Sequence, residues 1–177
     1  MKIAFVLLVV MQEYSKLINK FFQNQINRKL IVILLLVYTS IANAAVTEIE
    51  KLDFGTLAVL SNDSVSEITI NLDNQITFTN HIRVLLPGHR GEYLLSAYEP
   101  FKELFISANI VQTETSSTAA PSQQFTLLSL SSVSAITTDL NGDATVFVGG
   151  KIASSGNAVG IYYDTAYTVI FELSINF

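Results

Sequence analysis

The residues best spaced for chemistry are three polar side chains at alternate positions, Asp139, Asn141 and Asp143. Oxygen ligands in this spacing begin calcium-binding loops, which place a bidentate Glu at the twelfth position. Counting from Asp139, that position is Gly150. The Asn141–Gly142 pair also lies between apolar runs and signals a hairpin, because both residues tolerate positive φ. The pattern therefore favours a turn over a metal site, and no cofactor is expected.

Nucleophilic and metal-assisted catalysis have little support in the sequence. Cysteine is absent, which excludes disulfides, cysteine-ligated metals and thiol nucleophiles. Neither a G-x-S-x-G nor an H-E-x-x-H motif is present. We predict His81 on the flank of a strand, His89 and Arg90 in a solvated turn, and Glu48 and Glu50 on a solvated strand face. The chain is therefore not expected to be an enzyme.

The elements that position these residues begin after an apolar N-terminal segment. In residues 1–44, 28 are apolar. Arg28 and Lys29 precede the apolar run Leu30–Val37, and Ala42–Ala44 has the small-x-small form of a cleavage site. A basic region, a short apolar region and such a site are typical of a secretory signal peptide. We predict cleavage after Ala44 and a periplasmic, extracellular or cell-surface location.

A second apolar run, Ile3–Met11, precedes this signal. A signal peptide of 44 residues is unusually long, so we predict that translation begins later, at Met11 or near Leu17. Residues 1–10 or more are then untranslated. The alternative is a retained anchor, but a run of nine apolar residues is too short to span a bilayer.

The mature segment 45–177 is acidic, with five basic and fourteen acidic residues and a net charge of −9. Nucleic-acid binding requires a basic surface and is not expected. Apolar residues alternate with polar ones at period two, which predicts strands with one buried face. The clearest rows are Ile68–Leu72, Leu104–Ile110, Ala144–Val148 and Tyr167–Phe177.

Turn signals separate these strands at short intervals. They are 61–64, 72–74, 87–91, 139–143 and 154–157. The Ser/Thr-rich segment 113–124 is expected to be an exposed loop. Many short strands with such punctuation predict a single all-β domain over 45–177, an antiparallel sandwich or a small barrel.

The chain ends inside an alternating strand, at Phe177. Two functional interpretations compete. An exposed terminal edge strand can be captured by a chaperone through β-strand addition. A terminal Phe is also typical of outer-membrane β-barrels, but eight strands of about ten residues would use nearly the whole mature segment.

Three motifs carry a family resemblance: 52–56, 139–144 leading into 148–152, and 160–162 leading into 167–177. In this order the chain resembles the bacterial secreted family filed as domain of unknown function 4402. The resemblance implies an exported, immunoglobulin-like (pilin-like) β-sandwich, distantly similar to spore-coat-U-like and chaperone–usher pilin subunits. It implies no catalytic residues.

Several motif residues have expected structural roles. Gly55 lets the chain bend after a buried Phe54, and Gly149–Gly150 predicts a bulge. The structural motif residues are Leu52, Phe54, Gly55, Gly142, Gly149, Gly150, Gly160, Tyr162 and Phe177.

Together these features predict an exported, non-enzymatic structural or interaction protein of the bacterial envelope, a pilin-like or adhesin-type subunit. Its partners are expected to be proteins bound through edge strands, either a chaperone or neighbouring subunits, and Val46–Phe54 is a segment that could be donated to a neighbour. No nucleic-acid partner and no membrane-spanning mature domain are expected. The alternatives are a secreted module for a glycan or cation and a small outer-membrane β-barrel.

Overall fold

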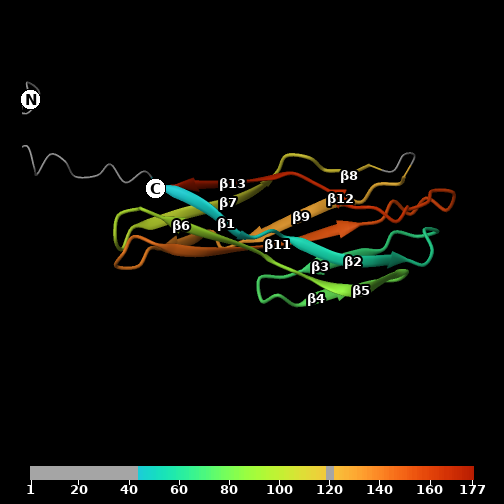
Figure 1. Cartoon of the computed structure of the whole chain (residues 1–177), viewed down its shortest axis with the longest axis horizontal. Helices are drawn as coiled ribbons and strands as arrows, with labels where there is room; N and C mark the ends of the chain where they lie inside the picture. Colours follow the sequence, from blue (N-terminus) through green and yellow to red (C-terminus); the bar gives the residue numbers. More distant parts are fainter. Residues whose placement is uncertain (1–43, 119–121) are drawn as a thin grey trace, which may run out of the picture. The chain divides into compact units, whose positions relative to one another are not determined.

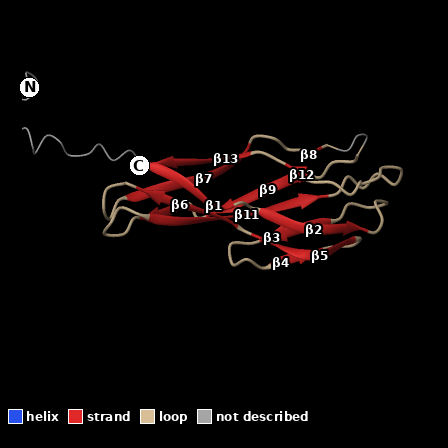
Figure 2. Cartoon of the chain, in the orientation of Figure 1, coloured by secondary structure: helices blue, strands red, loops and turns tan. Residues whose placement is uncertain are grey.

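The computed structural model describes residues 44–118 and 122–177. These ranges contain strands and loops and no helix (Figures 1 and 2). Every strand pair is antiparallel, so the prediction of an all-β antiparallel sandwich is confirmed. The predicted signal peptide and translation starts lie outside the described residues, apart from Ala44 itself. No helix that could cross a bilayer is found within the described ranges.

The strands form one six-stranded sheet and three smaller ones. The large sheet contains β1 (Ala45–Glu50), β6 (Gly91–Ser96), β11 (Ala144–Ala153), β3 (Glu67–Ile70), β4 (Ile76–Phe78) and β9 (Thr126–Ser132). The smaller sheets are β10 (Ala135–Thr137) with β7 (Glu103–Ile110) and β13 (Phe171–Asn176), β2 (Asp53–Val59) with β5 (Ile82–His89), and β8 (Ser116–Ser117) with β12 (Tyr167–Thr168).

Strand β11 runs through the centre of the domain and changes partner along its length (Figure 1). Its first half pairs with β6 and its second half with β3, while β9 follows the opposite edge. The change of partner falls at Gly149–Gly150, where a Cβ on Gly149 would lie 2.4 Å from the Ile70 carbonyl oxygen. The register shift against β9 lies between Lys151 and Ile152, one residue beyond the glycine pair for which the sequence predicts a bulge. These glycines therefore allow the close approach of β3.

Two hydrophobic clusters fill the sandwich, one on each side of this change of partner. The first lies between β1–β6–β11 and β10–β7–β13, with Leu95, Leu104 and Val146 fully buried. The second lies between β3, β9 and β11 on one side and β2–β5 on the other, around Ile68 and Ile82. Three of the alternating rows supply Ile68, Leu104, Ile106, Ala144, Val146 and Val148 to these clusters, whereas the row Tyr167–Phe177 supplies only partly buried residues.

The turn predicted at 87–91 is wrong. Pro87 and Gly88 lie within β5, and only Arg90 separates β5 from β6. The chain passes directly from one sheet to the next here. At the junction, the Arg90 guanidinium lies 3.5 Å from the centre of the Phe147 ring and donates a hydrogen bond to the Leu72 carbonyl. His89 and Arg90 are therefore strand and junction residues.

Two further expectations need correction. The final alternating row is broken into β12 and β13, because the chain changes partner from β8 to β7 at Val169–Ile170. The segment 113–124 is not wholly an exposed loop, since it contains β8 and the buried Thr115. Thr115 accepts a hydrogen bond on Oγ1 from the Phe125 amide at 2.9 Å, which holds this segment against β9.

Candidate functional site

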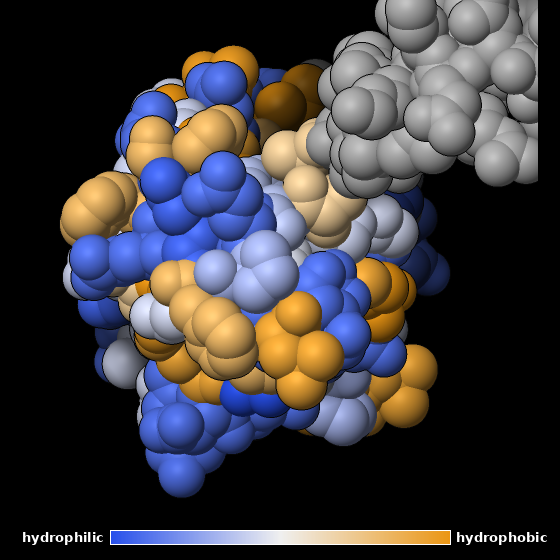
Figure 3. Space-filling model, turned by 90° about the vertical axis from the view of Figure 1, so that its left-hand side faces the viewer, coloured by the Kyte–Doolittle hydropathy of each residue, from blue (hydrophilic) through white to orange (hydrophobic). Residues whose placement is uncertain are grey.

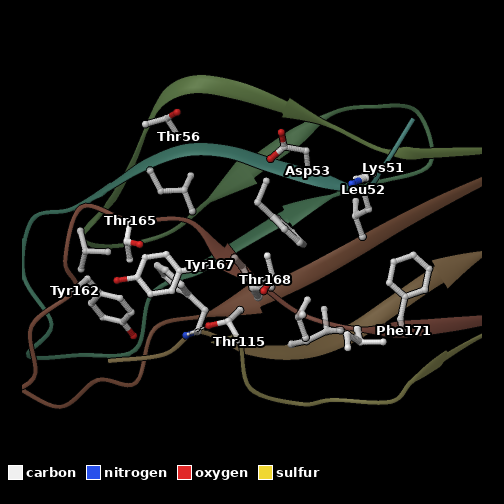
Figure 4. Close-up of a pocket in the computed structure, with 18 of the residues that line it drawn as sticks. Lys51, Leu52, Asp53, Thr56, Thr115, Tyr162, Thr165, Tyr167, Thr168 and Phe171 are labelled. Atoms are coloured by element: carbon white, nitrogen blue, oxygen red, sulfur yellow. Dashed lines mark hydrogen bonds between the residues drawn. The ribbon is translucent and has the colours of Figure 1, made fainter. Parts of the chain in front are cut away.

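A groove of about 950 Å³ opens between β2 and the segment Tyr162–Leu173, which carries β12 and the start of β13 (Figure 4). Figure 4 shows Leu52 of the β1–β2 junction near Phe171, and Tyr162 and Tyr167 farther along the same groove. The site therefore lies between segments that are more than a hundred residues apart in the sequence.

Both long sides of the groove are edges of sheets. β2 pairs only with β5, and β13 pairs only with β7. The two sides run in opposite directions: in Figure 4, Leu52 and Phe171 lie toward one end of the groove, and Thr56 and Tyr162 lie toward the other. An edge strand presents unpaired backbone N–H and C=O groups. The groove thus has a hydrogen-bonding main chain on each side.

The floor of the groove is apolar and belongs to the hydrophobic core. Tyr93, Phe125, Leu127 and Ile152 line it and are buried. Their neighbours on the two sides, among them Phe54, Leu57, Val59 and Val169, are only half-buried. The half-buried side chains on the two sides, above this buried floor, are the apolar surface that the groove offers to a ligand.

Aromatic rings form one end of the floor. The Phe125 ring centre lies 4.5 Å from that of Tyr162 and 5.2 Å from that of Tyr167. The Tyr162 hydroxyl accepts a hydrogen bond from the Ser155 amide at 2.8 Å and donates one to the Gln124 carbonyl at 3.1 Å. This hydroxyl is therefore engaged inside the protein.

The Tyr167 hydroxyl is engaged in the same way. It donates to the Tyr163 carbonyl at 2.9 Å and lies 2.6 Å from the Ser122 hydroxyl. Aromatic faces point into the groove while these polar tips hold the surrounding loops. The surface offered here suits an apolar side chain better than a ligand that needs hydrogen bonds.

Four charged side chains line the groove: Glu48, Lys51, Asp53 and Asp164. Three of the four are acidic. Burial raises the pKa of Tyr93 on the floor, and the Glu48 carboxylate raises it further. A buried phenol that resists ionisation beside a carboxylate indicates a poorly solvated floor under an acidic rim.

The polar triad singled out by its spacing forms a turn. The Asp139 carboxylate accepts hydrogen bonds from the backbone amides of Asn141 at 2.8 Å and Asp143 at 2.9 Å. These amides, Asp143 first, lower the pKa of Asp139. Gly142 takes a φ of 81°. In the described part of the chain, no group of three or more acidic or histidine side chains is arranged to hold a metal ion.

Each of the two histidines lies beside an exposed carboxylate. His81 Nε2 lies 3.3 Å from the Asp63 carboxylate, and His89 Nδ1 lies 3.6 Å from that of Glu50. Both imidazoles are about 40% exposed, at 41% and 38%, so each pair is screened by solvent. Neither histidine lines the groove.

The structure brings three of the motif residues, Leu52, Phe54 and Tyr162, to the groove. Gly55, with a φ of 79°, bends β2 beside them, as the sequence predicts. Gly160 lies in the 154–161 loop and donates a hydrogen bond to the Asn157 carbonyl at 2.8 Å. The sequence gives no sign of Thr56 or Val169 as groove residues, because nothing local shows that β2 and β12 face each other.

The β6–β7 and β10–β11 loops form one end of the sandwich (Figure 1), and Figure 3 shows this end in space-filling form. Apolar and hydrophilic side chains are mixed on this face, and Phe101 and Leu140 are its most exposed apolar loop residues, at 72% and 70%. Phe177, also 72% exposed, stacks edge-on against Tyr98 at 5.6 Å. This contact anchors the last residue of the chain.

Comparisons with protein-family models, with curated proteins and with solved structures find no match for this chain. The function therefore has to be argued from the groove itself.

Proposed function

We propose that the chain is an exported, non-enzymatic interaction protein of the bacterial envelope, a structural or adhesin-type subunit that joins a protein partner through its edge strands. The observation that carries the proposal is the apolar groove between β2 and β12–β13. The motif resemblance to secreted family 4402, for which no family model matches, implies the same function.

A polypeptide strand fits this groove for two reasons. Among the described strands, the groove-side edges of β2 and β13 have no strand partner and can offer main-chain hydrogen bonds, and the half-buried side chains on the two sides offer apolar contacts. Recognition by β-strand addition uses both, since the backbone supplies affinity and alternate side chains supply specificity. The groove runs beside β2, whose seven residues extend over about 23 Å, at about 3.3 Å per residue.

A glycan-binding function has less support. Sugars are bound by stacking on aromatic rings together with hydrogen bonds to their hydroxyls, and the hydroxyls of Tyr162 and Tyr167, the two rings packed on Phe125, are already paired within the protein. The strand-binding proposal uses the features that are left free, which are the ring faces and the strand edges.

Site-specific photocross-linking in intact cells of the producing bacterium tests this function. A photoreactive amino acid at Thr56, which lines the groove, should cross-link to one discrete protein partner in the envelope fraction. The matched control is the same amino acid at Glu172, which lies on β13 but outside the groove, and it should give no such product. Retention of the protein in the cytoplasm, or equal products from both positions, would overturn the proposal.

A further inference from the structure

The charges around the groove are unbalanced in a way that constrains its partner. Glu48, Lys51 and Asp53 lie at the end where β1 meets β2, and Asp164 lies near the other end, beside Tyr162. All four side chains belong to exposed residues. Carboxylates thus stand at both ends of an apolar floor, and the single amine stands at one end.

The surrounding surface adds to this imbalance. The described part of the chain carries five basic and fourteen acidic residues. Within a charged cleft whose walls are apolar, the field of one sign is focused and raises the local concentration of ligands of the opposite sign. An anionic segment approaching this groove would be repelled, and a cationic one attracted.

The geometry of the two sides sets how such a segment lies. Because the sides run in opposite directions (Figure 4), a strand placed between them is antiparallel to one and parallel to the other. Successive side chains of a strand point to opposite faces, so every second residue meets the floor. The residues at the ends of the segment then lie beside the carboxylates.

We infer that the groove binds an extended segment of a protein partner in which apolar residues alternate and the flanking residues are cationic. The inference rests on the proposed function and adds the chemistry of the segment. The apolar residues contact Leu57, Phe125 and Tyr162, and the flanking Lys or Arg residues lie beside Glu48 and Asp164. Charge complementarity of this kind acts mainly on specificity and on the rate of association.

Three synthetic peptides with blocked termini test the inference on the purified protein expressed from the full chain. In one-letter code they are KKTVTVTVTKK, its acidic counterpart EETVTVTVTEE, and KKTTVVVTTKK, which keeps the composition and charge of the first but loses the alternation. Binding is followed by calorimetry, and the site is located by amide hydrogen exchange. The first peptide should bind at least about tenfold more tightly than either of the others at low salt.

The difference in affinity between the cationic and the acidic peptide should decrease as the salt concentration is raised from about 0.05 M to about 0.5 M, because exposed charges are screened. Protection from exchange should appear in β2 and β12–β13. The double variant Glu48→Gln with Asp164→Asn should remove most of the preference for the cationic peptide. The control, Glu103→Gln with Glu172→Gln, removes the same number of carboxylates from exposed positions on β7 and β13 outside the groove and should leave the preference intact.

Each remaining result has a defined meaning. Equal binding of the cationic and acidic alternating peptides, with protection in β2, would overturn the charge complementarity and leave the strand-binding function standing. Equal binding of the two cationic peptides, unaffected by the groove variants, would mean non-specific attraction to an acidic protein and would refute the inference. Binding of none of the peptides would count against the proposed function as well.

Discussion

The two halves of the sandwich share one central strand and differ in how well their cores are covered. In the closed half, formed by β1, β6, β7, β10 and β13 with the first part of β11, six residue pairs join β13 to β7. In the open half, formed by β2–β5, β8, β9 and β12 with the rest of β11, two residue pairs join β12 to β8. One pairing therefore covers the first cluster continuously. Over the second cluster the β2–β5 sheet, itself joined by six residue pairs, and the short β8–β12 pair lie on opposite sides of the groove.

The difference shows that a complete hydrophobic core is not needed along the whole domain. Leu95, Leu104, Val146 and Val148 exclude solvent completely in the closed half. The open half keeps Ile68 fully buried against β11 but leaves the side chains of β2 half-exposed. Binding regions are drawn from the less stable parts of a protein, because they must open to admit a partner. The closed half is expected to supply the stability that permits this.

The largest expected difference between the halves is in the free energy of unfolding lost when one leucine is replaced in each. Leu104→Ala, in the closed half, should lower the free energy of unfolding by about 2–5 kcal/mol, because it leaves a cavity in a packed core. Leu57→Ala, in the open half, should cost roughly 1 kcal/mol, because its side chain is already half in water. Urea unfolding measures both. Equal losses would contradict the division into halves.

Much of the closed half could be predicted from the sequence. Period-two alternation predicts β7 and the first part of β11, because burial on one face imposes that pattern directly on the residues. The turn at 139–143 is predicted by Asn141–Gly142, because it depends on local backbone preferences alone. The hairpin expected there is wrong, because β10 pairs with β7 and β11 pairs with β6, so the turn joins two different sheets. The turn forms, with Gly142 in the left-handed region.

The open half could not be predicted in the same way. Pro87 and Gly88 have the composition of a turn, yet they continue β5, where a Cβ on Gly88 would lie 1.9 Å from the Asp53 carbonyl oxygen. The close approach of β2, a distant segment, decides their conformation. The groove depends on the same pairing of distant strands, and alternation in Tyr167–Phe177 says which face is buried but not which strand lies opposite.

A second test compares the glycines of one loop from each half. Gly142 and Gly156 both have positive φ, of 81° and 67°. A Cβ on Gly142 would lie 1.9 Å from the Tyr98 carbonyl oxygen, whereas on Gly156 its nearest neighbour is a Val65 methyl at 2.9 Å. The left-handed conformation alone costs about 1–2 kcal/mol.

Gly142→Ala should therefore lower the free energy of unfolding by more than about 2 kcal/mol, since the backbone clash adds to the conformational cost. Gly156→Ala should cost less, about 1–2 kcal/mol, since its tightest backbone contact, the Val65 amide nitrogen at 3.0 Å, is far less severe than the clash at Gly142. Thermal melts of the two variants make the comparison. A greater loss from Gly156→Ala would show that the loops of the open half are the more rigid.

The third test concerns Asn62, which joins two loops at the end of the open half. Its side-chain amide donates to the Ser155 hydroxyl at 2.9 Å and to the Asn157 carbonyl at 2.8 Å, and its carbonyl accepts from the Gly156 amide at 3.0 Å. Asn62 is only 8% exposed, so its loss leaves buried groups without partners.

Asn62→Ala should cost about 1–2 kcal/mol, and the change should be local. Amide exchange should accelerate in 154–160 and stay unchanged in β7 and β13. Asn109→Ala is the control, because Asn109 donates to the Ser174 hydroxyl at 3.3 Å on an exposed face of the closed half. Faster exchange throughout the closed half in Asn62→Ala would mean that the two halves unfold as one unit.

The smallest effect is expected from a single carboxylate at the end of the closed half. Because the amides of Asp143 and Asn141 lower the pKa of Asp139 below its ordinary 3.8, the folded state binds the proton less readily than the unfolded state. The stabilisation is therefore complete above the unfolded pKa and disappears as the pH falls through the folded value.

As the pH is lowered, the melting temperature of the wild type should fall further than that of Asp139→Asn. The amide oxygen of Asn still accepts hydrogen bonds but does not titrate. Amide exchange locates the effect: in the wild type, acid should loosen 139–143 before it loosens the groove strands β2 and β12. If the variant and the wild type lose the same stability as the pH falls through the folded pKa of Asp139, the turn at 139–143 does not depend on the Asp139 charge. The stability of this turn then depends on the backbone conformation of Gly142.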